Sequence, residues 1–163
     1  MKDIITRILV PTDFSDTADV ALEYARPLAA RFGASLHLLH VLDDPVLTEG
    51  LVAEAYMTEA PSIRTSLLED ARVRLGHRVQ GCATSEAVFG RGATTIADYA
   101  ERCQIDLIVM GTHGRTGLAH LLLGSVAERV VRTAACPVLT VGHTAAPARR
   151  QVPVEEVAAF QPA

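Results

Sequence analysis

The chain has 163 residues, the size of one domain with a buried core of its own. Apolar residues make up 49% of it and charged residues 21%, a balance that excludes a disordered chain and favours a soluble globular one. The formal net charge of −4 argues against non-specific binding to nucleic acid or to an anionic membrane, and leaves room only for a local anion site.

The N-terminus and the cysteines predict a cytoplasmic protein. The opening residues MKDIITRILVPTD contain no long apolar core and no small-residue cleavage site, so we expect no signal peptide. No segment reaches the roughly 18–20 uninterrupted apolar residues of a membrane span. Cys82, Cys103 and Cys136 lie far apart and form no C-x-x-C pair, which predicts buried free thiols in a reducing compartment.

The start of the chain predicts a strand, a helix and a second strand. Residues 4–11 (IITRILVP) are rich in β-branched side chains and stop at a proline, as a buried strand would. A helix follows, with Ser15 as its N-cap and Gly33 as its end. Its apolar face repeats at helical spacing, at Ala18, Ala21, Leu22, Ala25, Leu28, Ala29 and Phe32. Residues 34–42 predict the next strand.

The middle of the chain is less regular. Residues 43–60 lack clear periodicity and contain a proline and a glycine, so we expect a long loop with at most a helical turn. A second helix is predicted from apolar residues four positions apart, at Ile63, Leu67, Ala71 and Leu75. Residues 77–86 (HRVQGCATSE) alternate in polarity and predict a half-exposed strand.

Strands and helices alternate more clearly in the second half. Residues 93–103 predict a helix, 106–110 (DLIVM) the most apolar strand, 125–134 another helix and 137–141 (PVLTV) the last strand. This alternation predicts an α/β fold, a parallel sheet with helices on both faces. Residues 143–163 turn to Ala, Pro, Gln and charged side chains, and we expect a loose extension.

Two polar turns follow predicted strands and mark the expected binding edge. PTDFS (11–15) follows the first strand and GTHG (111–114) follows the fourth. Ligands of open α/β sheets bind outside the carboxyl ends of the strands, where the strand order reverses. If these two strands are neighbours at that point, both turns flank one crevice.

Spaced glycines suit the second turn to phosphate. Gly111 and Gly114 allow close approach of backbone N–H groups, and ten residues later Gly124 and Ser125 open a helix whose dipole favours anions. Ser125 and Glu128 also form an S-x-x-E capping box, so Ser125 has a purely structural alternative role as a cap, and the glycines as turn residues. The pattern is neither a Walker loop nor G-x-G-x-x-G.

The spacing Gly111-x2-Gly114-x9-Gly124-Ser125 resembles the G-2x-G-9x-G-[ST] signature of the ATP-binding branch of the universal stress protein family. The segments ILVPTDFSDTADVALEYA and DLIVMGTHGRTGLAHLLLGSVAERVVRTAACPVLTV are similar to that family, and the resemblance covers about residues 3–142. It implies one domain over residues 1–142, built as an open parallel five-stranded sheet of order 3-2-1-4-5, Rossmann-like, with residues 143–163 outside it. One departure is Gly92, where the family often has proline.

The resemblance also implies which residues contact the adenine and the ribose. Pro11, Thr12 and Asp13 of the first turn would touch these groups, with Asp13 accepting a hydrogen bond from a ribose hydroxyl. Asp13 has an alternative role as an acid at a helix start. Val41, at the end of the second strand, would meet the adenine edge through its backbone, and is otherwise ordinary core.

On the phosphate side, the resemblance implies that Met110 and Gly111 line the ribose and phosphates. The phosphates themselves would be held by backbone N–H groups, those of Gly114, Arg115, Gly124, Ser125 and Val126, with the Ser125 hydroxyl added. Arg115 also offers a charged donor, or faces solvent as loop arginines do. Arg91 is a weaker candidate for that role, and His113 either contacts a phosphate or faces solvent.

No protein-built metal site and no catalytic residue is predicted. The sequence has no H-E-x-x-H motif and no Cys/His cluster, although Mg²⁺ or Mn²⁺ can arrive with ATP. The favoured function is an ATP-binding regulatory module of the stress response. The alternative is a slow ATP hydrolase or nucleotidyl-transfer enzyme, for which the sequence supplies no evident general base. A scaffold that no longer binds nucleotide is the third possibility, against which the intact glycines and Asp13 argue.

The last predicted strand indicates a homodimer. In the implied strand order it forms a sheet edge, and a short apolar edge must be covered or paired. Pro137 lacks an N–H and suits the first position of such a strand. We expect Val138, Leu139 and Val141 to help form a two-fold dimer, as the family commonly does.

Overall fold

The protein is built from nine helices and strands within the residues that the structure describes. The structure is a computed structural model that describes residues 5–43, 53–112 and 123–142. In chain order the elements are β1 (Arg7–Pro11), α1 (Asp16–Phe32), β2 (Ser35–Leu42), α3 (Ala53–Gly76), β3 (Thr84–Phe89), α4 (Gly92–Arg102), β4 (Leu107–Gly111), α5 (Ser125–Thr133) and β5 (Val138–Val141).

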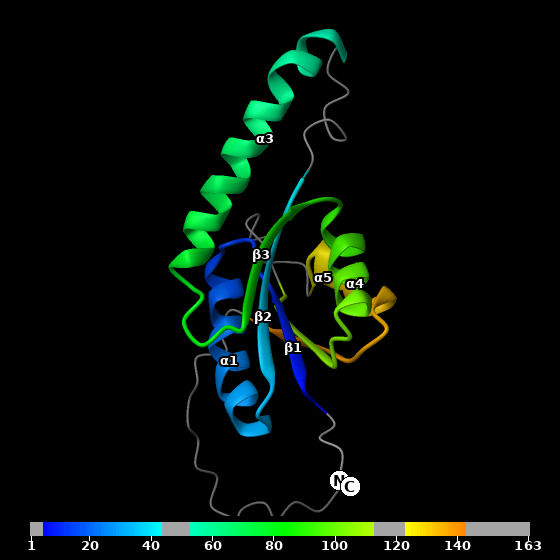
Figure 1. Ribbon diagram of the computed structural model, residues 1–163. Coiled ribbons are helices and arrows are strands. Elements are labelled where there is room, and N and C mark those ends of the chain that lie inside the picture. The colour runs from blue at the N-terminus through cyan, green and yellow to red at the C-terminus, as the bar shows by residue number, and fades with distance from the viewer. Residues whose placement is uncertain (1–4, 44–52, 113–122, 143–163) are drawn as a thin grey trace, which may run out of the picture.

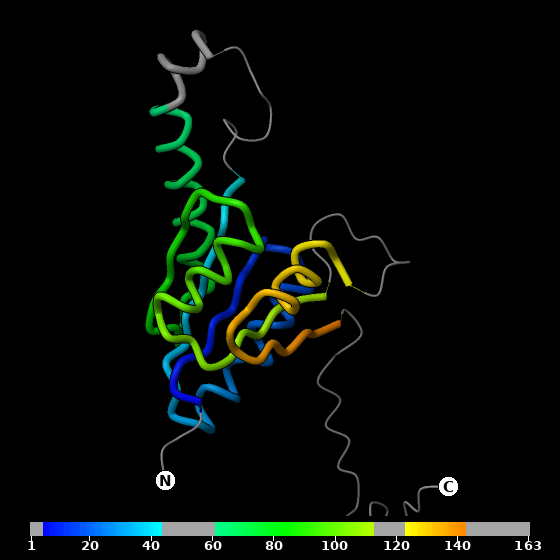
Figure 2. The backbone as a smooth tube through the Cα atoms, turned by 90° about the vertical axis from the view of Figure 1, so that its right-hand side faces the viewer, coloured from blue at the N-terminus to red at the C-terminus, as the bar shows by residue number. Residues whose placement is uncertain are grey.

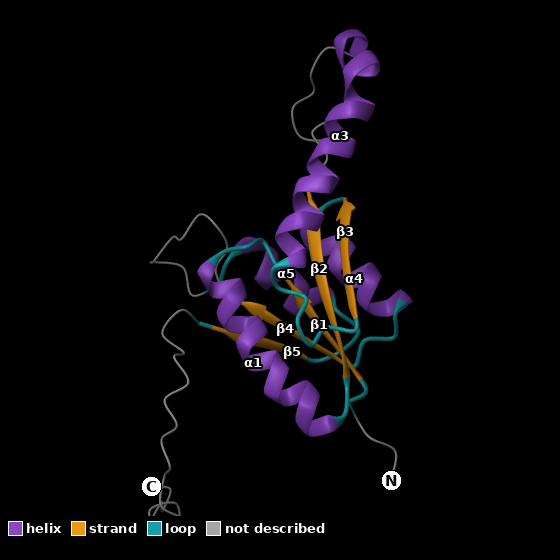
Figure 3. Ribbon diagram, turned by 60° about the vertical axis from the view of Figure 1, so that its left-hand side comes forward, coloured by secondary structure: helices purple, strands orange, loops and turns teal. Residues whose placement is uncertain are grey.

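The strands form one parallel sheet of order β3-β2-β1-β4-β5, which confirms the predicted fold class. β1 is central, and its Leu9 pairs with His37 of β2 on one side and with Ile108 of β4 on the other. Figures 1 and 3 show helices on both sides of this sheet. The strand order reverses between β1 and β4, so this is the edge where a doubly wound sheet binds its ligands.

Each face of the sheet has its own apolar core. Ile8 and Val10 of β1 pack with the α1 and α3 side, whereas Leu9, between them, packs with the α4 and α5 side. All three side chains are fully buried. Alternation along a strand buried on both faces explains the near-continuous apolar sequence of β1. Burial of such a side chain stabilises the fold by roughly 1.5–3 kcal/mol.

Helix α1 begins and ends where the sequence predicted. The Ser15 side chain accepts a hydrogen bond from the N–H of Ala18, and Asp16 and Asp19 add negative charge to the first turn. Gly33 ends the helix with a left-handed φ of 65°, and its N–H donates to the carbonyl of Ala29. The helix start matters most, because it lies directly after the turn that follows β1.

Helix α3 is longer than predicted. The expected loop over 43–60 is wrong from Ala53 onward, where α3 already begins. Figure 1 shows this first part of α3 running past the carboxyl edge of the sheet, and Figure 2 shows the later part of the helix beside the sheet. Ala71 and Leu75 are buried as predicted, but Ile63 and Leu67 are 41% and 37% exposed. At Ile63 and Leu67 the helix therefore extends beyond the buried core. Helical spacing of apolar residues marks the part of a helix that packs on the core, so it did not predict where α3 begins.

The third strand lies later than predicted. Residues 77–83 form turns after the end of α3, including Gly81 with a φ of 77°, and β3 covers Thr84–Phe89 instead of 77–86. The alternation that predicted a strand there reflects a turn whose Cys82 and Val79 are half-buried. β5 begins at Val138, and Pro137 lies just before it, with its carbonyl accepting from the N–H of Ile108.

The cysteines are free, as predicted, but half-buried rather than buried. Burial raises the pKa of the Cys82 thiol and of the Cys136 thiol, which disfavours the reactive thiolate. Over the described ranges, no helix combines the length and the apolar character that a membrane crossing needs.

Candidate functional site

The two turns at the switch point lie in contact. A Cβ atom added at Gly111, the last residue of β4, would lie 3.0 Å from the backbone of Thr17 in the first turn of α1. A side chain there would force the Thr17 backbone to move by a few tenths of an ångström, so glycine is favoured by close approach rather than by φ. The carboxyl end of β4 and the start of α1 therefore form one surface, as the interpretation of one shared crevice requires.

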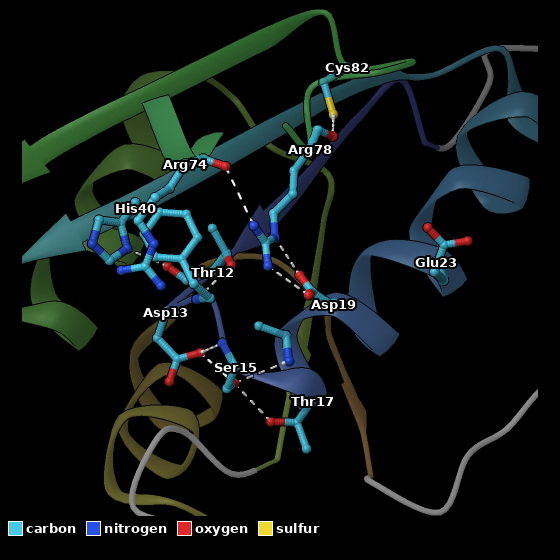
Figure 4. Close-up of polar contacts among 12 residues, drawn as sticks. Thr12, Asp13, Ser15, Thr17, Asp19, Glu23, His40, Arg74, Arg78 and Cys82 are labelled. Atoms are coloured by element: carbon cyan, nitrogen blue, oxygen red, sulfur yellow. Dashed lines mark hydrogen bonds and ion pairs between the residues drawn. The ribbon is translucent and has the colours of Figure 1, made fainter. Parts of the chain in front are cut away.

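Asp13 is held by the residues that follow it. Its Oδ1 accepts from the N–H of Ser15 at 3.1 Å and from the Ser15 hydroxyl at 2.5 Å (Figure 4). The Ser15 oxygen also accepts from the N–H of Ala18 at 3.3 Å and lies 3.0 Å from the Thr17 hydroxyl. Because the single Ser15 proton goes to Asp13, the Thr17 hydroxyl is the donor in that last contact. Asp13 thus supports the helix start and is fixed in orientation by it.

Thr12 is bound through its backbone and through its side chain. Its N–H donates to the carbonyl of Leu39 at 2.8 Å, and its hydroxyl oxygen accepts from the N–H of Phe14 at 3.0 Å. Its carbonyl lies 2.7 Å from Nδ1 of His40, and since a carbonyl only accepts, that nitrogen carries a proton. Thr12 and His40 are 6% and 8% exposed, so these bonds are largely shielded from water.

Phe14 has an unusual backbone within this turn. Its φ is 65°, in the left-handed region that costs a residue with a Cβ atom about 1–2 kcal/mol. The ring lies 4.3 Å from the His40 ring and 4.0 Å from the Arg74 guanidinium carbon, measured to the ring centroid. Contacts between a cation and an aromatic face contribute about 0.5–2 kcal/mol, enough to offset much of the backbone cost.

Arg78 lies beyond Arg74 and joins α3 to α1. Its Nε and Nη2 donate to the two carboxylate oxygens of Asp19 at 2.6 and 2.8 Å (Figure 4). The hydrogen bond to Asp19 raises the pKa of the Arg78 guanidinium. Its carbonyl accepts from Arg26 at 2.9 Å, and its guanidinium carbon lies 5.3 Å from the Phe14 ring centroid. Phe14 is thus covered by two arginines.

The second turn is closed by its main chain. The N–H of Thr112 donates to the carbonyl of Val141 at 2.9 Å, and the carbonyl of Thr112 accepts from the N–H of Gly124 at 2.6 Å. The end of β4 is therefore bonded directly to the residue before α5. The two halves of the glycine-spaced segment meet here, although 113–122, with the predicted contacts Gly114 and Arg115 and the candidate His113, lies outside the described residues.

The predicted capping box at the start of α5 is wrong. Gly124 is the N-cap, with φ −70° and ψ 155°, and among the described residues no side chain caps the helix. Ser125 is the first helical residue and is exposed, and Glu128 instead pairs with Arg132 at 3.0 Å. An N-terminus without a side-chain cap leaves the backbone N–H groups of its first turn available to a ligand.

The remaining predicted contacts gather on the α4 and α5 face. Met110 is buried there and Val41 is half-buried in the same cluster. Val126, in the first turn of α5, is 43% exposed, and its methyl groups lie 3.5–3.6 Å from where a Cβ atom of Gly92 would be. The starts of α4 and α5 are therefore neighbours at this edge. Pro11, at the end of β1, is buried.

Sequence reasoning missed the supporting residues of the first turn. His40 lies between Leu39 and Val41 of β2, and Arg74 and Arg78 lie four residues apart, Arg74 in the last turn of α3 and Arg78 in the turn after it. The spacing of the arginines is a visible signal, but a basic pair at a helix end is common. The left-handed φ of Phe14 has no sequence signal, because phenylalanine is a residue that disfavours it.

Apart from Arg78, the following groups with shifted pKa values lie away from this edge. Backbone hydrogen bonds from Thr6 lower the pKa of Asp106, which joins the starts of β1 and β4. Burial lowers the pKa of His37 and raises that of its partner Tyr99, whose hydroxyl lies 3.2 Å from His37 Nδ1. Within the ranges described, no three His, Cys, Asp or Glu side chains are grouped to hold a metal ion.

Comparison with known proteins agrees with this architecture. A family model described as the universal stress protein family matches residues 5–142. The universal stress protein MJ0531 of Methanocaldococcus jannaschii is 36% identical over 147 residues, which cover 86% of this chain and 84% of the relative.

Two solved structures have a similar fold. The structure of the hypothetical protein MJ0577, also from M. jannaschii, has a TM-score of 0.74 at 29% identity and covers 88% of this chain and 99% of its own. A universal stress protein solved in complex with cAMP has a TM-score of 0.56 at 25% identity, with 85% and 97% covered. The sheet order, the two polar turns and these matches together show that the chain belongs to the universal stress protein family.

Proposed function

We propose that this protein binds ATP at the carboxyl edge between β1 and β4 and acts as a nucleotide-dependent regulatory module of the stress response. The observation that carries the proposal is the 2.6 Å hydrogen bond from the N–H of Gly124 to the carbonyl of Thr112. It joins the two halves of the glycine-spaced segment at the edge where Asp13 is held. A relative solved with cAMP supports an adenine nucleotide as the ligand class.

The geometry supports a division of roles along this edge. Asp13, fixed by Ser15, would accept from a ribose hydroxyl, with Val41 at the adenine edge and Met110 lining the ribose and phosphates. The N–H of Gly124 is already bonded to Thr112, so we assign the phosphate contacts of α5 to the N–H groups of Ser125 and Val126. A helix start with free N–H groups is a good anion site.

The decisive experiment is to identify the nucleotide that accompanies the purified protein. Mass spectrometry of the released small molecules, followed by calorimetric titration with ATP, AMP and cAMP, should show ATP bound. Gly114→Val should abolish this, since the signature requires close backbone approach at that position. Gly142→Ala is the control, because the nearest described atom to a Cβ atom there is the Thr112 hydroxyl oxygen at 4.0 Å. Undiminished ATP in Gly114→Val contradicts the proposal.

An assay of ATP turnover on the purified protein distinguishes a nucleotide-binding protein from an ATP-consuming enzyme. A single-turnover assay with labelled ATP should release no phosphate or pyrophosphate at rates near 1 s⁻¹, a typical lower enzyme speed. Faster release would establish the hydrolase or nucleotidyl-transfer alternative. Repeating the titration with Mg²⁺, with Mn²⁺ and with EDTA tests whether the ion enters on the phosphates, as we propose.

We also propose a homodimer formed through the edge strand β5. Leu139 is 40% exposed and Val138 is half-buried, whereas Val141 is 5% exposed and packs in the core of its own chain. Leu139 therefore has the most surface to offer a partner. Leu139→Asp should give monomers by light scattering, and Val73→Asp, at an exposed position of α3, should not. A dimeric Leu139→Asp protein overturns this interface.

Two further proposals concern the whole chain. We place the protein in the cytoplasm, with residues 1–142 as the folding domain and 143–163 dispensable for it. Truncation after Gly142 should leave the thermal unfolding midpoint within a few degrees of the full chain. Fractionation of cells that express the tagged protein tests the compartment.

A further inference from the structure

We propose that Phe14, packed between His40 and Arg74, is a positioning residue that sets the direction of the Asp13 carboxylate toward a bound nucleotide. The inference rests on the proposed function, and extends it from contact residues to the side chains behind them. It assigns the end of α3, through Arg74, and the turn after it, through Arg78, a role in nucleotide affinity.

The backbone of Phe14 has a conformation that is uncommon at its position. Two residues other than glycine have a positive φ in the ranges described, Phe14 at 65° and Gln104 at 51°. Gln104 follows the end of α4, where left-handed residues commonly end helices. Phe14 lies before a helix, where no such habit applies. Strained residues of this kind persist when their surroundings fix them, and they gather at ligand sites.

Side chains, rather than the local backbone, fix this conformation. The Phe14 ring lies 4.3 Å from the His40 ring and 4.0 Å from the Arg74 guanidinium. His40 in turn donates to the carbonyl of Thr12, whose hydroxyl accepts from the N–H of Phe14. These contacts close a ring around Thr12 and Phe14, the two residues that flank Asp13.

Arg78 links the Phe14 ring to the first turn of α1. Arg78, held by both oxygens of Asp19, covers the same ring from 5.3 Å. Asp19 is in the first turn of α1, four residues after Ser15, and its N–H donates to the Ser15 carbonyl. The residue that fixes Asp13 and the residues that fix Phe14 therefore belong to one connected set. Loosening Phe14 should free the Asp13 turn before it unfolds the domain.

The test uses four variants of the full chain. Phe14→Gly accepts the left-handed backbone but removes the ring, and Phe14→Tyr keeps the ring. Arg74→Ala removes the cation above it, and Arg72→Ala, at an exposed position of the same helix, is the matched control. Calorimetric titration with ATP should show affinity roughly tenfold weaker for Phe14→Gly and for Arg74→Ala, because an ordered site is lost. Phe14→Tyr and Arg72→Ala should match the wild type.

A second readout needs no nucleotide. The Ser15 amide, which donates to Asp13, should exchange with solvent faster in Phe14→Gly than in the wild type, at unchanged exchange in the central strand β1. If Ser15 exchange and ATP affinity are both unchanged in Phe14→Gly, the positioning role is overturned while ATP binding stands. If the wild type binds no ATP, AMP or cAMP, the proposed function fails, and the inference fails with it before any variant is made.

Discussion

The two helix starts at the carboxyl edge of the sheet are built in opposite ways. The start of α1 is held by side chains, with Ser15 capping the helix and Asp13 bound to Ser15. The start of α5 has no side-chain cap and is held by the main-chain bond between Gly124 and Thr112. The side-chain cap of α1 occupies the N–H of Ala18, one of those that an anion would need, so the start of α5 is the better suited to phosphate.

Adding one carbon at Gly111 should give the largest effect, because it forces the end of β4 away from the start of α1. In Gly111→Ala the new Cβ atom would lie 3.0 Å from the Thr17 backbone, which has no flexible end that could move. We expect the free energy of unfolding to fall by about 1–3 kcal/mol in urea denaturation. Gly142→Ala, with only one atom at 4.0 Å, is the control. Equal stability of the two variants would mean that α1 and β4 are not in close contact.

Removing each serine hydroxyl tests the difference between the starts directly. Ser15→Ala should cost about 1 kcal/mol of unfolding free energy, because it deletes a working cap. Ser125→Ala deletes no cap bond and should change stability by less than about 0.5 kcal/mol. Thermal or urea denaturation measures both. A cost at Ser125 as large as at Ser15 would restore the capping box that the structure excludes.

Asp106, at the amino ends of β1 and β4, offers a pH-dependent control that leaves the starts of the helices α1 and α5 intact. Asp106 Oδ2 accepts from the Thr6 N–H, the Thr6 hydroxyl and the Arg7 N–H at 2.8–2.9 Å, and these bonds lower the pKa of the carboxyl group. Its contribution to stability is therefore complete above the unfolded pKa of about 3.9 and is lost as the pH falls through the lower folded pKa.

Denaturation of wild type and Asp106→Asn at several pH values checks this expectation. The stability difference between them should shrink on acidification below about pH 4. Nucleotide affinity near neutral pH should be unchanged, since Asp106 lies at the other end of β4. A pH-independent difference would mean that the charge of Asp106 contributes nothing.

The smallest expected effect is at Gly92, beside the start of α5. A Cβ atom there makes ordinary contact with the Val126 methyl groups at 3.5–3.6 Å. Gly92→Ala should therefore stabilise the protein by roughly 0.4–1 kcal/mol, chiefly by restricting the unfolded chain. Thermal denaturation measures the gain. A loss of stability would show that the starts of α4 and α5 are packed more tightly than the structure has them.

The helices and strands could be predicted from the sequence wherever the spacing of apolar residues marks contact with the core. The start of α1 at Ser15 and its end at Gly33 were predicted because helix caps have local chemical signatures. The strand order was predicted from the family resemblance and is confirmed. The beginning of α3 and the position of β3 were not, because α3 outruns the core and a turn alternated in polarity as a strand does.

The place of the candidate site in the fold was predictable from the sequence, but the side chains that support its first turn were not. Asp13 and Gly111 could be identified because a polar turn or a glycine directly after an apolar strand can be recognised in the sequence. The capping box at Ser125 failed because the pattern cannot tell whether the N-cap is that serine or the glycine before it. The stacking of Phe14 with His40 and Arg74 joins three separate elements, which no local pattern encodes.

The uneven burial of α3 implies that one continuous helix has two levels of stability. Its last turns contain Ala71 and Leu75, which are 3% and 2% exposed, whereas Ile63 and Leu67 are half-exposed on the part that leaves the sheet. Helices are stabilised mainly by tertiary packing, so amides near Ala71 should open only with the domain. Amides around Ile63 should open by local fraying, at a rate that depends little on the stability of the core. The helix would then behave as a rigid support at the Phe14 end and as a fluctuating arm at the other.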